Sequence, residues 1–101
     1  MDNAVGPVLR MCDELEAVIQ ALVEDNPGRE VQVLDHGAYV RVQTPDFLRL
    51  RRATLRRLAG NSFELRQLGA IMSSFAGRIA ASSEEVTWSL GEPSPAEQGG
   101  G

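Results

Sequence analysis

The side chains able to perform chemistry are few in this chain of 101 residues, because it holds one histidine, His36, and one cysteine, Cys12. A carboxylate-bridged diiron site in a helical protein needs two Glu-x-x-His pairs, and a structural zinc site needs about four Cys or His ligands. The sequence shows neither the Gly-x-Ser-x-Gly elbow of many hydrolases nor a phosphate-binding Gly-x-Gly-x-x-Gly loop. We therefore predict a non-enzymatic protein without a metal or a cofactor. His36 is interpreted as a polar turn residue and Cys12 as a packed or surface thiol.

All ten basic residues are arginine, although the formal net charge is −4. The chain has no acidic residue between Asp46 and Glu64, and this stretch carries Arg49, Arg51, Arg52, Arg56 and Arg57. The segment Arg49–Arg57 has three open interpretations: a docking surface for an acidic partner, a contact with nucleic-acid phosphates, or the solvated face of a short helix. Single-strand binders interleave aromatic and basic side chains, and this segment has no aromatic residue. The charge pattern alone does not choose among the three.

A second candidate surface is the run Ser-Ser-Phe-Ala-Gly-Arg at Ser73–Arg78. It joins a predicted helix to a predicted strand with small, polar and aromatic groups, where a core would contain aliphatic ones. One interpretation is a connector in which Phe75 fills the core and Gly77 relieves backbone strain. The other is a surface that contacts a partner, and both stay open at this point.

The first element that must position these groups is a helix near the N-terminus. An extended segment at Val5–Arg10 precedes it, and Asp13 is predicted to cap it together with Glu16. One apolar stripe at helical spacing is predicted to face the core and consists of Leu15, Val18, Ile19, Leu22 and Val23. The helix is expected to end at Asn26-Pro27-Gly28, because proline cannot continue the hydrogen-bond ladder.

The remaining patterns alternate between strand and helix. Strands are predicted at Val31–Leu34, Ala38–Val42, Arg78–Ala81 and Val86–Leu90, with a short extended piece at Phe47–Leu50. Two helices are predicted, at Ala53–Ala59 before Gly60 and from near Phe63 to Met72. Gly69 weakens the second helix, and we interpret it as a sign of close packing or of a functional approach.

The predicted fold is α+β, a single-domain sandwich of a mainly antiparallel sheet with about three helices on one side, in the order β-α-β-β-(β)-α-α-β-β. Residues 1–91 are expected to form the domain, and residues 92–101 a disordered polar tail. The sequence contains no apolar run of 18 residues and no basic region at its start that would resemble a signal peptide. We therefore expect a soluble cytoplasmic protein that does not bind membranes.

Four turn-rich signatures, in order, carry a family resemblance: Val5–Arg10, Asp25–Val31, Ala38–Arg41 and Ser73–Ile79. Together they resemble the effector (coupling) proteins of bacterial multicomponent diiron monooxygenases, the family of the methane, phenol and toluene monooxygenase regulatory proteins. Only four residues precede Val5, so we expect no long N-terminal arm like that of the methane-type regulators. The resemblance is therefore to the toluene, alkene and isoprene branch.

The resemblance implies a cofactor-free component that binds the diiron hydroxylase and affects its ferredoxin and reductase only indirectly. It would tune substrate access, oxygen activation and electron-transfer coupling during alkene or aromatic oxidation. The residues expected at the partner interface are Asn3, Val5, Gly6, Pro7, Arg51, Arg52, Ser73, Ser74, Phe75 and Gly77. The alternative is an unrelated α+β regulatory or RNA-binding module that uses Arg49–Arg57; the preferred interpretation involves no nucleic acid.

Overall fold

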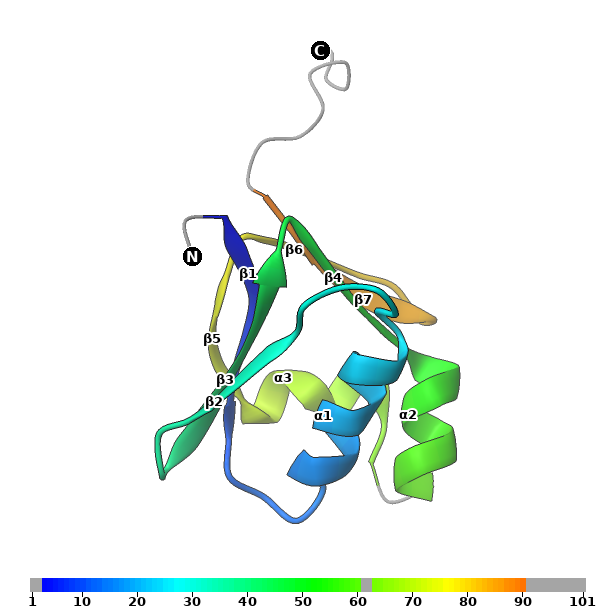
Figure 1. The fold of residues 1–101 in the computed structure, drawn as a ribbon. Helices are drawn as coiled ribbons and strands as arrows, with labels where there is room; N and C mark the ends of the chain where they lie inside the picture. The colour runs from blue at the N-terminus through cyan, green and yellow to red at the C-terminus, as the bar shows by residue number, and fades with distance from the viewer. Residues whose placement is uncertain (1–2, 61–62, 91–101) are drawn as a thin grey trace.

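The computed structural model describes residues 3–60 and 63–90, so the predicted tail at 92–101 lies outside the described residues. Figure 1 shows the order of the elements along the chain. They are β1 (Ala4–Arg10), α1 (Leu15–Glu24), β2 (Gln32–Asp35), β3 (Tyr39–Pro45), β4 (Phe47–Arg51), α2 (Arg52–Ala59), η2 (Leu65–Gln67), α3 (Leu68–Ile71), β5 (Met72–Ala76), β6 (Arg78–Ala81) and β7 (Glu85–Ser89). None of the described helices is long and apolar enough to cross a membrane.

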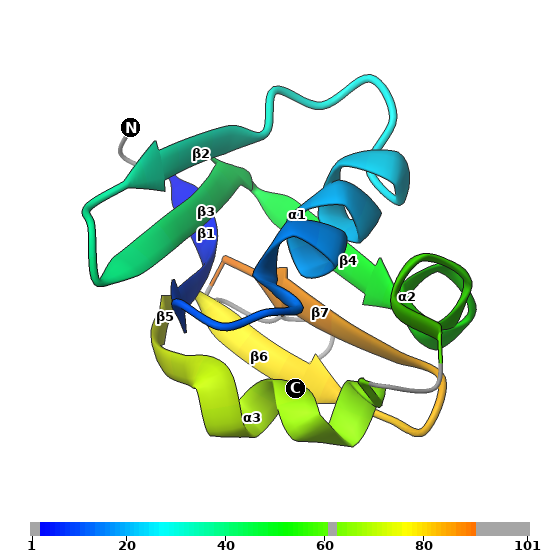
Figure 2. The same ribbon diagram turned by 90° about the horizontal axis from the view of Figure 1, so that it is seen from below.

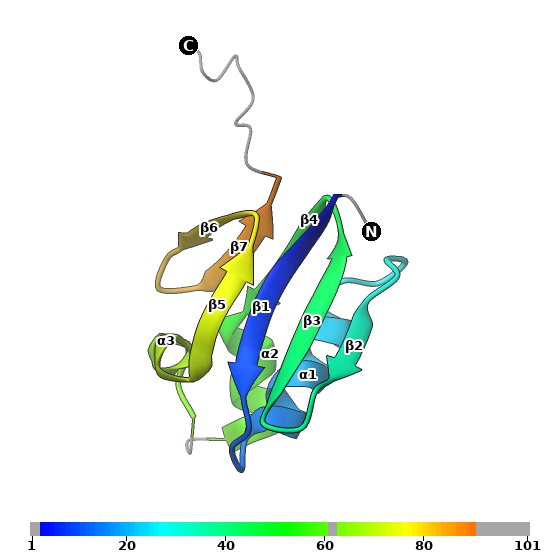
Figure 3. The same cartoon turned by 90° about the vertical axis from the view of Figure 1, so that its left-hand side faces the viewer.

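The strands form two antiparallel sheets, which confirms the α+β class and the antiparallel pairing but replaces the single predicted sheet with two. The larger sheet has the order β2-β3-β1-β5 and the smaller one the order β4-β7-β6. In Figure 3 the larger sheet faces the viewer, and α1 and α2 lie behind it. The helices therefore cover only one face of this sheet.

The chain passes from one sheet to the other at two corners. Asp46, with φ of 71°, separates β3 from β4, and Gly77, with φ of 93°, separates β5 from β6. A positive φ turns the strand direction sharply, and strands commonly switch sheets at such bends. These corners explain why the strands that were predicted correctly do not combine into one sheet.

The hydrophobic core lies between the two sheets and the helices. Its fully buried members include Leu9, Val42, Leu48, Leu50 and Trp88. Helix α1 packs on α2 and β4, whereas α3 packs on β5 and η2 (Figure 2). The core therefore ties the N-terminal and C-terminal parts of the chain into one unit.

Helix α1 differs from its prediction at both ends. It begins at Leu15, and no described side chain caps it, so the predicted Asp13 and Glu16 cap is wrong. Val23 is 48% exposed, because the buried side of the helix consists of Leu15, Val18, Ala21 and Leu22. Buried Asn26 fixes the end of the helix: its amide donates to the carbonyls of Leu22 (2.6 Å) and Arg49 (2.8 Å).

The helix predicted from Phe63 to Met72 is shorter than expected. It consists of the 3-10 turn η2 and the single α-turn α3, and the chain becomes strand β5 from Met72 onward. Leu65 and Leu68 are buried as predicted. Gly69 is exposed with open space around it, so the prediction of close packing there is wrong. The sequence missed β5 because Met-Ser-Ser-Phe-Ala lacks an alternating apolar pattern.

Candidate functional site

Strands β1 and β5 bring two of the four sequence signatures side by side. Their register pairs Pro7 with Phe75 and Val8 with Ser74. Strand β5 is the last strand of its sheet, so one of its two sides has no neighbouring strand among the described residues. An edge strand of this kind presents unpaired backbone donors and acceptors to a partner.

The exposed part of this strand is Ser73, Ser74 and Phe75, which we call the β5 edge. Phe75 is 44% exposed, so the interpretation of Phe75 as a core-filling residue is wrong. The register shifts between Val8 and Leu9, and Ser73 falls outside the paired positions. Such a bulge changes the direction of the strand and of its side chains. The β5 edge therefore combines two hydroxyls with an accessible aromatic ring.

Val5, Gly6 and Pro7 lie behind the β5 edge and not on it. Val5 is fully buried, and Gly6 and Pro7 are buried as well. A Cβ on Gly6 would overlap the carbonyl oxygen of Val42. These three residues are enclosed by the fold of the free chain, and their contact with a partner stays a prediction.

Gly77 closes the site from the other side. Its φ is 93°, and a Cβ there would overlap the carbonyl oxygen of Ser89 and lie 2.7 Å from Val5 Cγ1. Only glycine satisfies both the backbone angle and the available space. Gly77 therefore holds the end of β5 against β1 and β7.

Asn3 fastens the start of β1 to the corner at Asp46. Its Nδ2 donates to Asp46 Oδ1 at 2.7 Å, and the Asp46 backbone N–H donates to the Asn3 carbonyl at 3.0 Å. The side chain of Asn3 is half-buried. It lies on the rim of the larger sheet, next to the strands of the candidate site.

Arg51 and Arg52 belong to another part of the molecule. In the strand register, the backbone of Arg51 lies opposite Glu85 at the start of β7, whereas Gly77 lies against Ser89 at the end of the same strand. The backbone N–H of Arg52 donates to the Glu84 carbonyl at 2.8 Å. The structure therefore does not bring these two arginines together with the β5 edge.

The segment Arg49–Arg57 is divided among several environments. Arg49 forms an ion pair with Glu85 (3.2 Å), and Arg57 forms one with Glu24. The side chains of Arg51 and Arg52 form no hydrogen bond or ion pair with another residue in the part of the chain that the structure describes. A charge-balanced surface thus accounts for Arg49 and Arg57, and the segment does not form one continuous basic strip.

Sequence reasoning missed the open face of the larger sheet. Ser74, Val8, Arg41 and Leu34 are successive cross-strand neighbours, and we call this row the outer sheet face. Leu34 is 38% exposed and Val8 only 5%, and none of the helices drawn in Figure 3 covers this face. The sequence did contain a signal for this face. A strand covered on one face alternates apolar and polar residues, so the consecutive apolar pair Val33-Leu34 places one apolar side chain on each face.

Near this row, at the tip of the β2–β3 hairpin, His36 stacks on Tyr39 with 5.0 Å between ring centroids. The hairpin turn at His36 was predicted, and the stacking was not. Within residues 3–60 and 63–90, no group of three or more His, Cys, Asp or Glu side chains is arranged to hold a metal ion. The exposed groups of the β5 edge and the outer sheet face are therefore suited to contacts with another molecule.

Comparison with known proteins matches residues 3–89 to the model of the MmoB/DmpM family. The "Alkene monooxygenase system, effector subunit" of Xanthobacter autotrophicus (strain ATCC BAA-1158 / Py2) is 47% identical over 87 residues, which cover 86% of each chain. A chain in the structure of the phenol hydroxylase–regulatory protein complex superposes with a TM-score of 0.74 at 23% identity, covering 86% of this chain and 98% of that one. The soluble methane monooxygenase regulatory protein B superposes with a TM-score of 0.66 at 21% identity, covering 86% of this chain and 64% of that one. These two structural likenesses concern the fold alone.

Proposed function

The chain belongs to the MmoB/DmpM family, and from this we propose that it is the effector subunit of a multicomponent monooxygenase, which binds the hydroxylase and performs no bond chemistry itself. The observation that carries the proposal is the 47% identity to an alkene monooxygenase effector subunit across 86% of both chains. An alkene or an aromatic hydrocarbon is the substrate class we assign to the partner hydroxylase, and the cytoplasm is where we expect the complex.

The effector acts by differential binding. A protein that binds one hydroxylase conformation more tightly than another shifts the equilibrium between them, by no more than its difference in affinity. Through this shift it changes substrate access, oxygen activation and the timing of electron transfer. Ferredoxin and reductase are affected through the hydroxylase and need not touch the effector.

The surface we assign to the hydroxylase is the β5 edge together with the outer sheet face. Three features of the described residues support this choice: the exposed ring of Phe75, the side of β5 that no described strand pairs with, and a sheet face that no described helix covers. Backbone hydrogen bonds to an edge strand provide affinity, and flanking side chains provide specificity. Asn3, Val5, Gly6, Pro7 and Gly77 hold this surface in shape, and Arg51 and Arg52 form a separate, weaker contact.

The test is steady-state oxidation of an alkene or aromatic by the cognate hydroxylase with its ferredoxin and reductase, while this protein is titrated past one equivalent per active site. We expect the product formed per NADH consumed to rise and to saturate near stoichiometry. No change with an active cognate hydroxylase would refute the effector function.

The assigned surface has its own test. The Ser74→Glu variant places a charge on the β5 edge and is expected to weaken coupling at limiting effector without unfolding the domain. The Gln20→Glu variant adds the same charge at an exposed position of α1 and serves as the control. If both variants couple like the wild type, the hydroxylase binds a different surface.

A further inference from the structure

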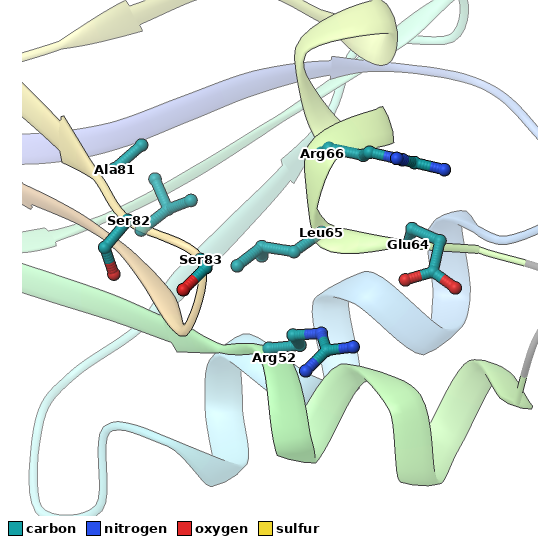
Figure 4. A pocket seen from close by; sticks show the side chains of 8 residues that line it. Arg52, Glu64, Leu65, Arg66, Ala81, Ser82 and Ser83 are labelled. Carbon is teal, nitrogen blue, oxygen red and sulfur yellow. The ribbon is translucent and has the colours of Figure 1, made fainter.

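A pocket of about 570 Å³ opens between α2, η2 and the turn that joins β6 to β7. Figure 4 shows this pocket and its side chains. Its volume falls in the range of about 300 to 1,000 Å³ that is usual for small-molecule sites. Its lining includes Arg52, which we assign to the weaker hydroxylase contact, but no residue of the β5 edge or the outer sheet face. It therefore lies apart from the main surface assigned to the hydroxylase.

The floor of the pocket is apolar. Leu65 and Val86 line it, and both side chains also belong to the hydrophobic core. They are 7% and 5% exposed, respectively. An apolar group placed on this floor would be shielded from water by side chains that are already fixed by the core, so little ordering would be needed on binding.

The rim of the pocket is charged. Arg52 and Arg66 extend from opposite walls, with Glu64 between them (Figure 4). Neither guanidinium forms a hydrogen bond or an ion pair with another residue in the described ranges. Two arginines and one glutamate leave the rim with one formal positive charge, which a single negative charge on a ligand would balance.

We propose that this pocket binds a small organic monocarboxylate. The ligand carboxylate lies on the arginine side of the rim, next to Glu64 and within reach of Arg52 and Arg66, because a guanidinium offers planar paired donors that match carboxylate oxygens. The apolar body lies on Leu65 and Val86. A neutral hydrocarbon would leave both arginines unpaired, and a multiply charged anion would meet the carboxylate of Glu64.

The pocket volume also bears on the size of the ligand. A single acidic side chain from a partner protein would leave most of the 570 Å³ empty, whereas an aromatic or medium-chain acid would occupy much more of it. We therefore assign the pocket to a free small molecule and not to a protein partner.

The test is a titration of the isotope-labelled full chain with benzoate or hexanoate, followed by amide chemical shifts in NMR. We expect saturable shifts centred on Leu65, Ser83 and Val86, with a dissociation constant of about 1 mM for ligands of this size. Hexanol tests the apolar body without the charge, and inorganic phosphate tests the charge without the apolar body. Both are expected to bind at least about tenfold more weakly.

Variants test the role of each charge. Arg52→Gln and Arg66→Gln are each expected to weaken hexanoate binding about tenfold. Glu64→Gln is expected to strengthen it about two- to fivefold by removing repulsion, an effect that damage to the fold would not produce. Arg57→Gln, on the same helix as Arg52 but outside the pocket lining, is the matched control and should bind like the wild type.

The proposal is overturned if the shifts are absent or map to another part of the molecule. It is also overturned if hexanol binds as tightly as hexanoate, or if Glu64→Gln weakens binding. None of these outcomes depends on the hydroxylase, so the result is independent of the effector function.

Discussion

The β5 edge and the pocket between α2, η2 and the β6–β7 turn are both open to solvent, but they present different chemistry. The β5 edge offers two hydroxyls, the exposed ring of Phe75 and a strand side that no other described strand pairs with, and it contains no charged residue. The pocket offers two guanidiniums that have no partner among the described residues, above an apolar floor. The first therefore suits recognition by shape and backbone hydrogen bonds, and the second suits recognition by charge. The two regions share no residue, since Ser73, Ser74 and Phe75 belong to β5 and the pocket residues belong to α2, η2, β6, β7 and their connections.

The largest expected effect is a loss of stability at Gly77, which supports the β5 edge. Gly77→Ala forces a Cβ against the Ser89 carbonyl at φ of 93°, and we expect it to lower the free energy of unfolding by about 3 kcal/mol or more. Gly37→Ala is the matched control, because Gly37 has φ of 91° but open space around it. It should cost only about 1 kcal/mol. Urea unfolding measures both, and equal costs would show that the contact with Ser89 is unimportant.

The second-largest expected effect comes from Asn26, which joins the end of α1 to β4 and lies away from the β5 edge. The side-chain oxygen of Asn26 accepts from the Arg49 backbone N–H at 2.9 Å, while its amide donates to the carbonyls of Leu22 and Arg49. Asn26→Ala leaves these backbone groups without partners, and we expect a loss of about 2 to 3 kcal/mol in unfolding free energy. At a temperature where the variant remains folded, its half-saturating concentration in the coupling assay should be unchanged. A large change there would mean that the two regions are coupled.

The third effect separates binding by the β5 edge from stability of the core. Phe75→Ala removes an exposed ring, and we expect less than about 1 kcal/mol of destabilisation together with an about tenfold higher half-saturating effector concentration. Phe63→Ala removes a buried ring and should instead cost about 3 kcal/mol or more. Comparing urea unfolding with coupling for the two variants separates binding from folding. Normal coupling by Phe75→Ala would remove Phe75 from the interface.

The smallest effect concerns charge. We expect the double variant Arg51→Gln, Arg52→Gln to raise the half-saturating effector concentration only about two- to threefold, because charges at the rim of an interface contribute little. The difference should disappear at high salt, which screens exposed charges. Arg57→Gln is the control, since Glu24 already balances Arg57. An effect above about tenfold that persists in salt would move the main interface to the arginine side.

The elements with a strong local signal were predicted well. The hairpin around Asp35-His36-Gly37, the short strand at Phe47, the stop of α2 at Gly60 and the final hairpin all appear at or near the predicted residues. In each case either alternation of apolar residues or a glycine with positive φ encodes the structure within a few residues. The predicted antiparallel α+β class follows from the same local patterns.

Strand β5 could not be predicted in this way. Its residues lack alternation, and its backbone is ordered by pairing with β1, with Ser73 Oγ lying 3.4 Å from the carbonyl of Val8, 65 residues away. Exposure was equally hidden: Phe75 is exposed because β5 is an edge strand, while Val5 is buried because the second sheet packs against it. The convergence of Arg52, Glu64 and Arg66 around one pocket also joins residues from separate elements.

The sequence by itself determined the inventory and the local shapes: one histidine and one cysteine, the order of most helices and strands, and the turn signatures of the family. The tertiary structure alone decided that the strands form two sheets, that β5 is the last strand of its sheet among the described residues, and that Arg51 and Arg52 lie apart from it. The physical reason is range. Backbone preference and apolar periodicity act over a few residues, whereas strand register, burial and the meeting of charges depend on contacts between residues far apart in the chain.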